Sequence, residues 1–220
     1  MSRERILTPN GAPPVVWAIA SVFVLFELAF QLAEAGVLPF PDLRWQVYLR
    51  LAFFDVFFEG VMRGASVPSV FWSSLVSHAF LHGGPLHLFM NGAIFLALGG
   101  VLARSLGSVR FIALCLVTAI GGAVVFGLLA DVQGPLVGAS GVLFGFFGAL
   151  KRWEWRWLAA TGQSKRRFWG SVLGLAAINV LLFFAYQGGV VAWEAHLGGF
   201  VTGWLIAPIL APGRAGPSPF

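Results

Sequence analysis

The stretch Gly138-Ala-Ser-Gly-Val-Leu-Phe-Gly-Phe-Phe-Gly148 is apolar and carries glycines at helical spacing. Gly141, Gly145 and Gly148 stand at positions i, i+4 and i+7 and therefore share one face of a predicted helix. Small residues in such a seam let a second helix approach closely inside a membrane. The segment therefore predicts a helix pair packed through glycine.

A matching seam lies near the end of the chain, where Gly199 and Gly203 are four residues apart. His196 precedes Gly199 by three residues and lies on nearly the same helix face. If the two seams pack together, His196 comes to lie beside Ser140.

The composition supports a membrane protein. Of the 220 residues, 58% are hydrophobic and 10% charged, and the mean hydropathy is +0.85, whereas a soluble domain carries about a quarter charged residues. Six segments approach the roughly 20 apolar residues that cross a bilayer: 14–33, 85–103, 110–130, 139–151, 170–186 and 190–210. We expect an all-α membrane protein, a compact bundle of six transmembrane helices, with a short fourth span if that span starts at Ser140.

This pattern leaves little chain for a separate soluble domain. We expect an N-terminal segment at 1–13, a membrane domain at 14–210 and a Pro/Gly-rich tail at 211–220. Ala33-Glu34-Ala35 faintly resembles a signal cleavage site, but the apolar run before it exceeds a usual signal core, so we expect the first span to be retained. The single cysteine, Cys115, permits no internal disulfide.

The net charge of +5 follows the expected topology. Six spans would place eleven cations on the side of the termini and only Arg44, Arg50 and Arg63 on the other side. The positive-inside rule then puts both termini in the cytoplasm, and we expect a multi-pass protein of the bacterial inner (plasma) membrane rather than a nucleic-acid binder. The connection 151–169 mixes tryptophans with cations, which favours an aromatic belt with cationic anchors over single-stranded nucleic-acid binding.

The connection between the first two spans, from about 34 to 84, is long, outward-facing and apolar. Its apolar runs are too short to span, so they are read as interfacial or re-entrant elements with a cavity nearby. Glu27 in the first span is either functional or held against a neighbour. His78 and His82 are read as structural residues of this connection; the alternative is a metal site, for which no further ligand lies close in sequence.

His87 and Asn91 are four apart on one helix face, below the outer end of the second span. Two neutral donors one turn apart can point at a single oxygen, as an oxyanion hole requires; a helix–helix hydrogen-bonded pair is the alternative.

Ser140 begins the fourth span, where its backbone N–H is an orphan donor and the helix dipole favours an anion. A contact with His196 would supply the general base that a hydroxyl nucleophile needs. Phe144, one turn later, could pack on the imidazole. Glu194 faces away from His196 on a helix, so the sequence predicts a Ser–His dyad rather than a triad.

Together these motifs closely resemble the rhomboid family of intramembrane serine proteases, from about residue 14 to 210. The matching stretches are His82-Gly-Gly-Pro-Leu-His-Leu-Phe-Met-Asn91 with Gly99-Gly100 after it, Gly138-Ala-Ser-Gly141, and Ala195-His-Leu-Gly-Gly199 with Gly203. The resemblance implies Ser140 as nucleophile, His196 as base, and His87 and Asn91 in the oxyanion hole with the Ser140 amide. It implies supporting roles for Gly138, Gly141, Phe144, Gly199 and Gly203.

The resemblance further implies cleavage of transmembrane protein substrates within the lipid bilayer near the outer surface, without cofactor or metal, and lateral substrate entry past the fifth span. The chain departs from the family pattern at Ala103, where a glutamate is frequent, at Trp72-Ser-Ser74, where a Trp-Arg pair is common, and in its phenylalanine-rich outer connection. Two alternatives are an inactive rhomboid-like protein that binds membrane clients and a small transporter or channel.

Overall fold

The computed structural model describes residues 11–130, 134–185 and 192–211, and in these residues every regular element is helical. The long helices are α1 (Pro14–Glu34), α5 (Pro85–Leu106), α6 (Ser108–Leu129), α7 (Ser140–Thr161), α8 (Arg166–Ala185) and α9 (Trp193–Leu210). They correspond in order to the six predicted segments, and the expectation of an all-α membrane fold is confirmed. The predicted N-terminal segment and tail lie almost entirely outside the described residues.

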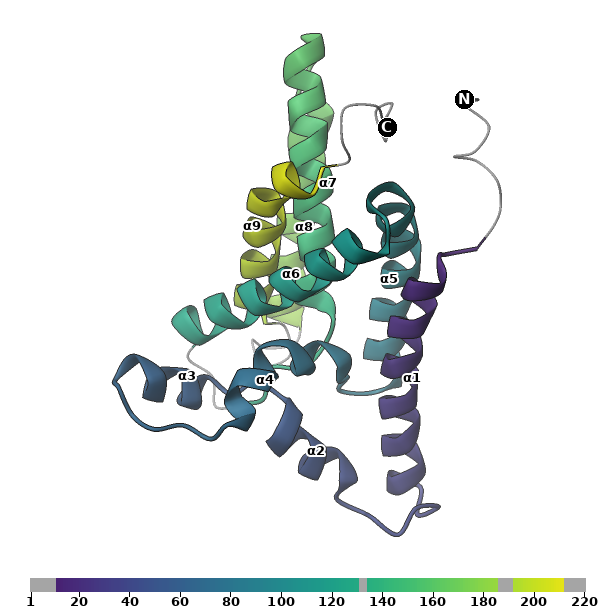
Figure 1. Cartoon of the computed structure of the whole chain (residues 1–220), viewed down its shortest axis with the longest axis vertical. Helices are drawn as coiled ribbons and strands as arrows, with labels where there is room; N and C mark the ends of the chain where they lie inside the picture. The colour runs from purple at the N-terminus through teal and green to yellow at the C-terminus, as the bar shows by residue number, and fades with distance from the viewer. Residues whose placement is uncertain (1–10, 131–133, 186–191, 212–220) are drawn as a thin grey trace.

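Among the described residues, α1, α5 and α6 are long and apolar enough to cross a membrane, judged by length and composition alone. Polar residues interrupt two of the others: α7 carries Lys151, Arg152, Glu154 and Arg156 in its second half, and α9 carries Glu194 and His196 near its start. In Figure 1 the start of α1, the α5–α6 and α7–α8 connections and the end of α9 lie toward one end of the molecule, and α2 to α4 toward the other. This arrangement gives the alternating chain direction expected of a multi-span bundle.

The expectation of a loop over 151–169 is wrong. Helix α7 continues through Thr161, and the connection to α8 is confined to Gly162–Lys165. The polar second half of α7 consists largely of residues that are compatible with a helix. Within it the Lys151 ammonium lies 2.6 Å from the Glu154 carboxylate, three residues later along the helix. The helix stops at Gly162, whose positive φ of 68° is a conformation that glycine adopts without strain.

The tryptophans of this region therefore project from helices. Trp155 packs on Phe168 at a centroid distance of 5.1 Å, and the Lys165 ammonium lies 3.9 Å from the Trp155 ring centroid. The aromatic belt stays a prediction.

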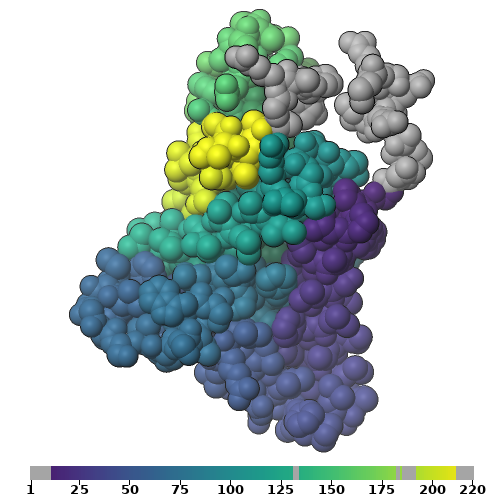
Figure 2. All heavy atoms as spheres, viewed as in Figure 1, coloured from purple at the N-terminus to yellow at the C-terminus, as the bar shows by residue number. Residues whose placement is uncertain are grey.

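The connection between α1 and α5 forms three short helices, α2 (Leu43–Leu51), α3 (Asp55–Met62) and α4 (Val70–Ser77), and a 3-10 turn, η2 (His78–Phe80). Elements α3 and α4 pack against α6, and Figure 2 shows this blue region directly beneath the teal helix. Phe53 and Leu136 form an isolated antiparallel bridge that ties the connection to the chain just before α7.

A polar network fixes this connection to α1. Glu27 is buried, and both of its carboxylate oxygens accept hydrogen bonds from Arg44, at 2.9 and 3.0 Å. Arg44 and Tyr48 each donate to the backbone carbonyl of His82 at 2.8 Å. Glu27 is thus held against a neighbour, and the network fixes the backbone just before α5.

The two histidines of this region are buried. His78 donates from Nδ1 to the Ser74 carbonyl at 2.8 Å, and its own carbonyl accepts from the Gly138 amide at 3.0 Å. Neither ring nitrogen of His82 has a hydrogen-bond partner in the described part of the chain. Burial lowers the pKa of His78 to about 4, and burial with the nearby His87 lowers the pKa of His82 to about 3, so both rings are neutral at pH 7.

Helices α7 and α9 pack backbone against backbone. A side-chain carbon on Gly199 would collide with the carbonyl oxygen of Gly141, and one on Gly203 with the carbonyl oxygen of Gly145. The backbones touch at both positions, so the two predicted glycine seams do pack together.

Gly199→Ala should therefore force α7 and α9 apart. Overpacking costs about 1–3 kcal/mol, which for a chain of this length lowers Tm by roughly 2–12 °C. Gly174→Ala on α8 is the matched control, because a side-chain carbon there meets nothing within 4 Å. Thermal unfolding in detergent checks this; equal Tm values for both variants would contradict a backbone contact at Gly199.

Acid should destabilise the fold through His78 and His82. Their unfolded pKa is about 6.5, so stability is complete above that pH and is lost as pH falls toward 4 and then 3, because only the unfolded chain takes up the protons. His82→Leu should leave the stability at pH 7 unchanged or higher and remove about 2 kcal/mol of the loss at pH 5. Urea or thermal unfolding at both pH values measures this; an identical pH 5 loss in the variant would refute it.

Candidate active site

Ser140 is the first residue of α7. The chain enters this helix through Gly138, whose φ of +119° is accessible to glycine and strained for other residues. At the helix start the Ser140 backbone N–H has no acceptor within the helix. Ser140 therefore offers its side-chain hydroxyl together with a backbone N–H that the helix leaves without an acceptor.

His196 lies in the first turn of α9 and is 8% exposed. Its Nε2 is 2.8 Å from Ser140 Oγ, and its Nδ1 is 2.7 Å from Asn179 Oδ1 on α8. Because an amide oxygen only accepts, Nδ1 carries the proton, and Nε2 is left with a lone pair directed at the serine hydroxyl. In this tautomer the imidazole can take the hydroxyl proton.

Phe144 lies one turn after Ser140, and its ring stacks on the His196 imidazole at a centroid distance of 4.2 Å and an interplanar angle of 6°. The stacking covers one face of the imidazole and restricts it to one plane. The glycine contact at Gly199 lies three residues further along α9, so the helix approach and the Ser140–His196 contact come from the same packing.

His87 and Asn91 project from the start of α5 toward Gly138. His87 Nδ1 accepts a hydrogen bond from the Gly83 amide at 3.3 Å, which leaves the proton on Nε2 as a donor. An added side-chain carbon on Gly138 would lie 2.8 Å from His87 Nε2 and 3.4 Å from Asn91 Nδ2. The two donors therefore converge on space that is open because residue 138 is glycine.

Asn91 is 5% exposed, and its Nδ2 has no partner among the described residues. A buried amide donor without an acceptor costs stability in the resting protein. The Asn91 amide points at Gly138, which precedes Ser140 by two residues in the sequence. A donor in this position, with no acceptor among the described residues, is suited to an oxygen that becomes charged only during a reaction.

Asn179 is a site residue that the sequence reasoning missed. The signal was present: it is the lone amide in the apolar run Leu175-Ala-Ala-Ile-Asn-Val-Leu-Leu182 of α8, and polar side chains within spans are functional candidates by default. The spacing of Asn179 from His196 is not helical, so only the packing of α8 against α9 brings them together.

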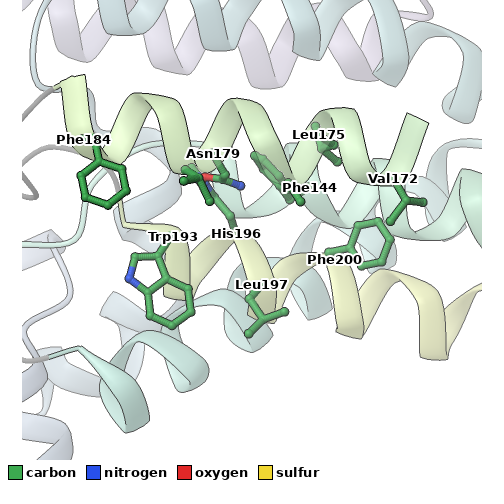
Figure 3. A pocket seen from close by; sticks show the side chains of 11 residues that line it. Phe144, Val172, Leu175, Asn179, Phe184, Trp193, His196, Leu197 and Phe200 are labelled. Atoms are coloured by element: carbon green, nitrogen blue, oxygen red, sulfur yellow. The ribbon is translucent and has the colours of Figure 1, made fainter. Parts of the chain in front are cut away.

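A cavity of about 520 Å³ opens between α8 and α9 beside His196. Figure 3 shows Asn179 and His196 next to each other in its wall, with Phe144, Trp193, Leu197 and Phe200 around them. Its wall is apolar apart from these two side chains and does not include Ser140. This cavity lies next to the imidazole and is not lined by the outer connection; the cavity expected beside that connection stays a prediction.

A metal centre finds no support in the described residues, because they contain no group of three or more His, Cys, Asp or Glu side chains placed to share an ion. His78 and His82 are the pair considered from the sequence. His78 binds the Ser74 carbonyl, whereas neither ring nitrogen of His82 has a partner among the described residues.

Comparisons with known proteins identify the family of the chain. A family profile described as "Rhomboid domain" matches residues 69–213. RHOMBOID-like protein 5 of Arabidopsis thaliana is 28% identical over 95% of this chain and 72% of its own length. Rhomboid protease GluP of Bacillus subtilis is 27% identical over 66% of the chain and 27% of its length, and Rhomboid protease GlpG of Yersinia pestis is 30% identical over 60% and 46%.

The chain thus covers less than half of the two bacterial relatives. The profile nevertheless matches well over half of the chain and includes Ser140, Asn179 and His196. Apolar helices, the helix order and the matched domain lead to one conclusion: this integral membrane protein belongs to the rhomboid family, which includes intramembrane serine proteases.

Proposed function

We propose that the protein is an intramembrane serine endopeptidase that cleaves transmembrane segments of membrane proteins with Ser140 and His196. The 2.8 Å contact between Ser140 Oγ and His196 Nε2 carries this proposal. A serine hydroxyl is a weak nucleophile, and a neutral imidazole within hydrogen-bond reach is the base that activates it. The family relationship supplies the class of substrate.

The reaction follows from the donors and acceptors of the site. Ser140 Oγ attacks the peptide carbonyl carbon while its proton passes to His196 Nε2. The carbonyl oxygen, now negative, accepts hydrogen bonds from His87 Nε2–H, Asn91 Nδ2–H and the Ser140 amide. The peptide C–N bond then breaks as His196 gives its proton to the leaving amine. Water, deprotonated by the same imidazole, attacks the acyl carbon; the ester bond to Ser140 breaks, and His196 returns the proton to Oγ.

The positions of the cations support one orientation of the protein in the membrane. The α5–α6 and α7–α8 connections lie at the end of the molecule opposite α2 to α4 in Figure 1. These connections and the adjoining parts of the helices carry Arg104, Arg110 and the cations between 151 and 167. Placing these cations in the cytoplasm puts Ser140 toward the extracytoplasmic half of the bilayer, where cleavage would occur. This orientation would place both termini in the cytoplasm; a bacterial inner (plasma) membrane remains part of the proposal, and the charge distribution does not bear on it.

Ser140→Ala and His196→Ala should each abolish cleavage of a transmembrane peptide that contains small and helix-breaking residues, reconstituted with the protein in liposomes. Loss of the nucleophile or its base lowers kcat by about 10³-fold or more. Ser105→Ala is the control and should retain full activity, because the Ser105 hydroxyl lies on α5 and donates to the Val101 carbonyl of the same helix. Cleavage at the wild-type rate by both site variants would reject the proposal; peptide binding without cleavage by the wild type would favour the inactive client-binding alternative.

Asn91→Ala should lower kcat by about 10²-fold with little change in KM, because one oxyanion donor is worth roughly that much. Gly138→Ala should be inactive, because its methyl group would fill the space between His87 and Asn91 and residue 138 would be strained at φ +119°. Initial rates on the same peptide measure both. An active Gly138→Ala protein would contradict the position assigned to the oxyanion.

A further inference from the structure

We propose that Asn179 is the positioning residue that holds His196 in the tautomer and ring orientation required of a general base. This inference rests on the proposed protease function and adds a third helix, α8, to its machinery. It replaces the sequence-based expectation of an unassisted Ser–His dyad.

The position of Asn179 explains why its amide binds the imidazole. The cavity around it is lined by apolar side chains of α8 and α9, among them Val172, Leu175 and Leu197. A side-chain amide loses water contacts in such surroundings and needs a protein partner. His196 Nδ1, at 2.7 Å from Oδ1, is that partner.

Tautomer control is the chemical reason that this bond matters. A neutral imidazole carries one proton, on either Nδ1 or Nε2. With the proton on Nε2 the ring cannot accept the Ser140 proton. The Asn179 oxygen accepts a hydrogen bond and therefore favours the proton on Nδ1, which keeps the Nε2 lone pair toward Ser140 Oγ.

Stacking on Phe144 alone cannot determine which ring nitrogen faces Ser140. A parallel ring at 4.2 Å fixes the plane of the imidazole, but a 180° rotation about the Cβ–Cγ bond keeps that plane and exchanges Nδ1 with a carbon. Only a partner at the ring edge distinguishes the two orientations. Phe144 therefore fixes the plane of the ring, and Asn179 selects between the two ring orientations that share this plane.

Asn179→Leu removes the acceptor and keeps a similar volume, so it should lower kcat about tenfold and leave KM unchanged. Asn179→Asp keeps an acceptor at the same place and should recover most of the lost rate. Ile178→Ala, an exposed residue one position earlier on α8 that does not line the cavity, is the matched control and should behave as the wild type.

Nitrogen NMR of ¹⁵N-histidine-labelled protein gives a readout that a merely structural role would not move. In the wild type the His196 signals, assigned by their loss in His196→Ala, should show a protonated Nδ1; in Asn179→Leu the proton should move toward Nε2. Wild-type kcat and unchanged signals in Asn179→Leu, or an Asp variant no better than Leu, would overturn the inference. If the wild type cleaves nothing, or Ser140→Ala cleaves as well as the wild type, the protease proposal itself fails instead.

Discussion

The backbone contact between α7 and α9 is the constraint on which the rest of the structure depends. Gly141 and Gly145 of α7 meet Gly199 and Gly203 of α9 at distances that leave no room for a side chain. Ser140 and His196 each lie within one turn of this contact, so the helix packing itself brings Oγ and Nε2 within 2.8 Å. Inside a bilayer, where helices gain little from hydrophobic burial against each other, close packing of this kind is the main means of fixing such a distance.

The remaining polar groups are fixed by separate devices. The donors of α5 depend on the backbone before that helix, where Arg44 and Tyr48 bind the His82 carbonyl and the Gly83 amide binds His87 Nδ1. The imidazole of His196 depends on α7 for its plane and on α8 for its rotation. In the proposed reaction each donor or acceptor is thus set before a substrate arrives, which is how a preorganised site lowers the barrier to charge development.

Periodicity and spacing predicted the features that arise within one helix. The six apolar segments, the two glycine seams and the shared face of His87 and Asn91 all follow from a repeat of 3.6 residues. Features that depend on two elements meeting were missed: Asn179 beside His196, and the specific pairing of Glu27 with Arg44. The length of α7 was missed for another reason, because its charged second half ends the apolar pattern without ending the helix.

The central claim is that His196 activates Ser140 as a nucleophile, and covalent labelling tests it most directly. A fluorophosphonate probe should react with the purified protein in detergent, and peptide mass spectrometry should locate the adduct on Ser140. His196→Ala should abolish this labelling while the protein remains folded, because the hydroxyl loses its base. An adduct on a different residue, or equal labelling of Ser140 in His196→Ala, would contradict the account.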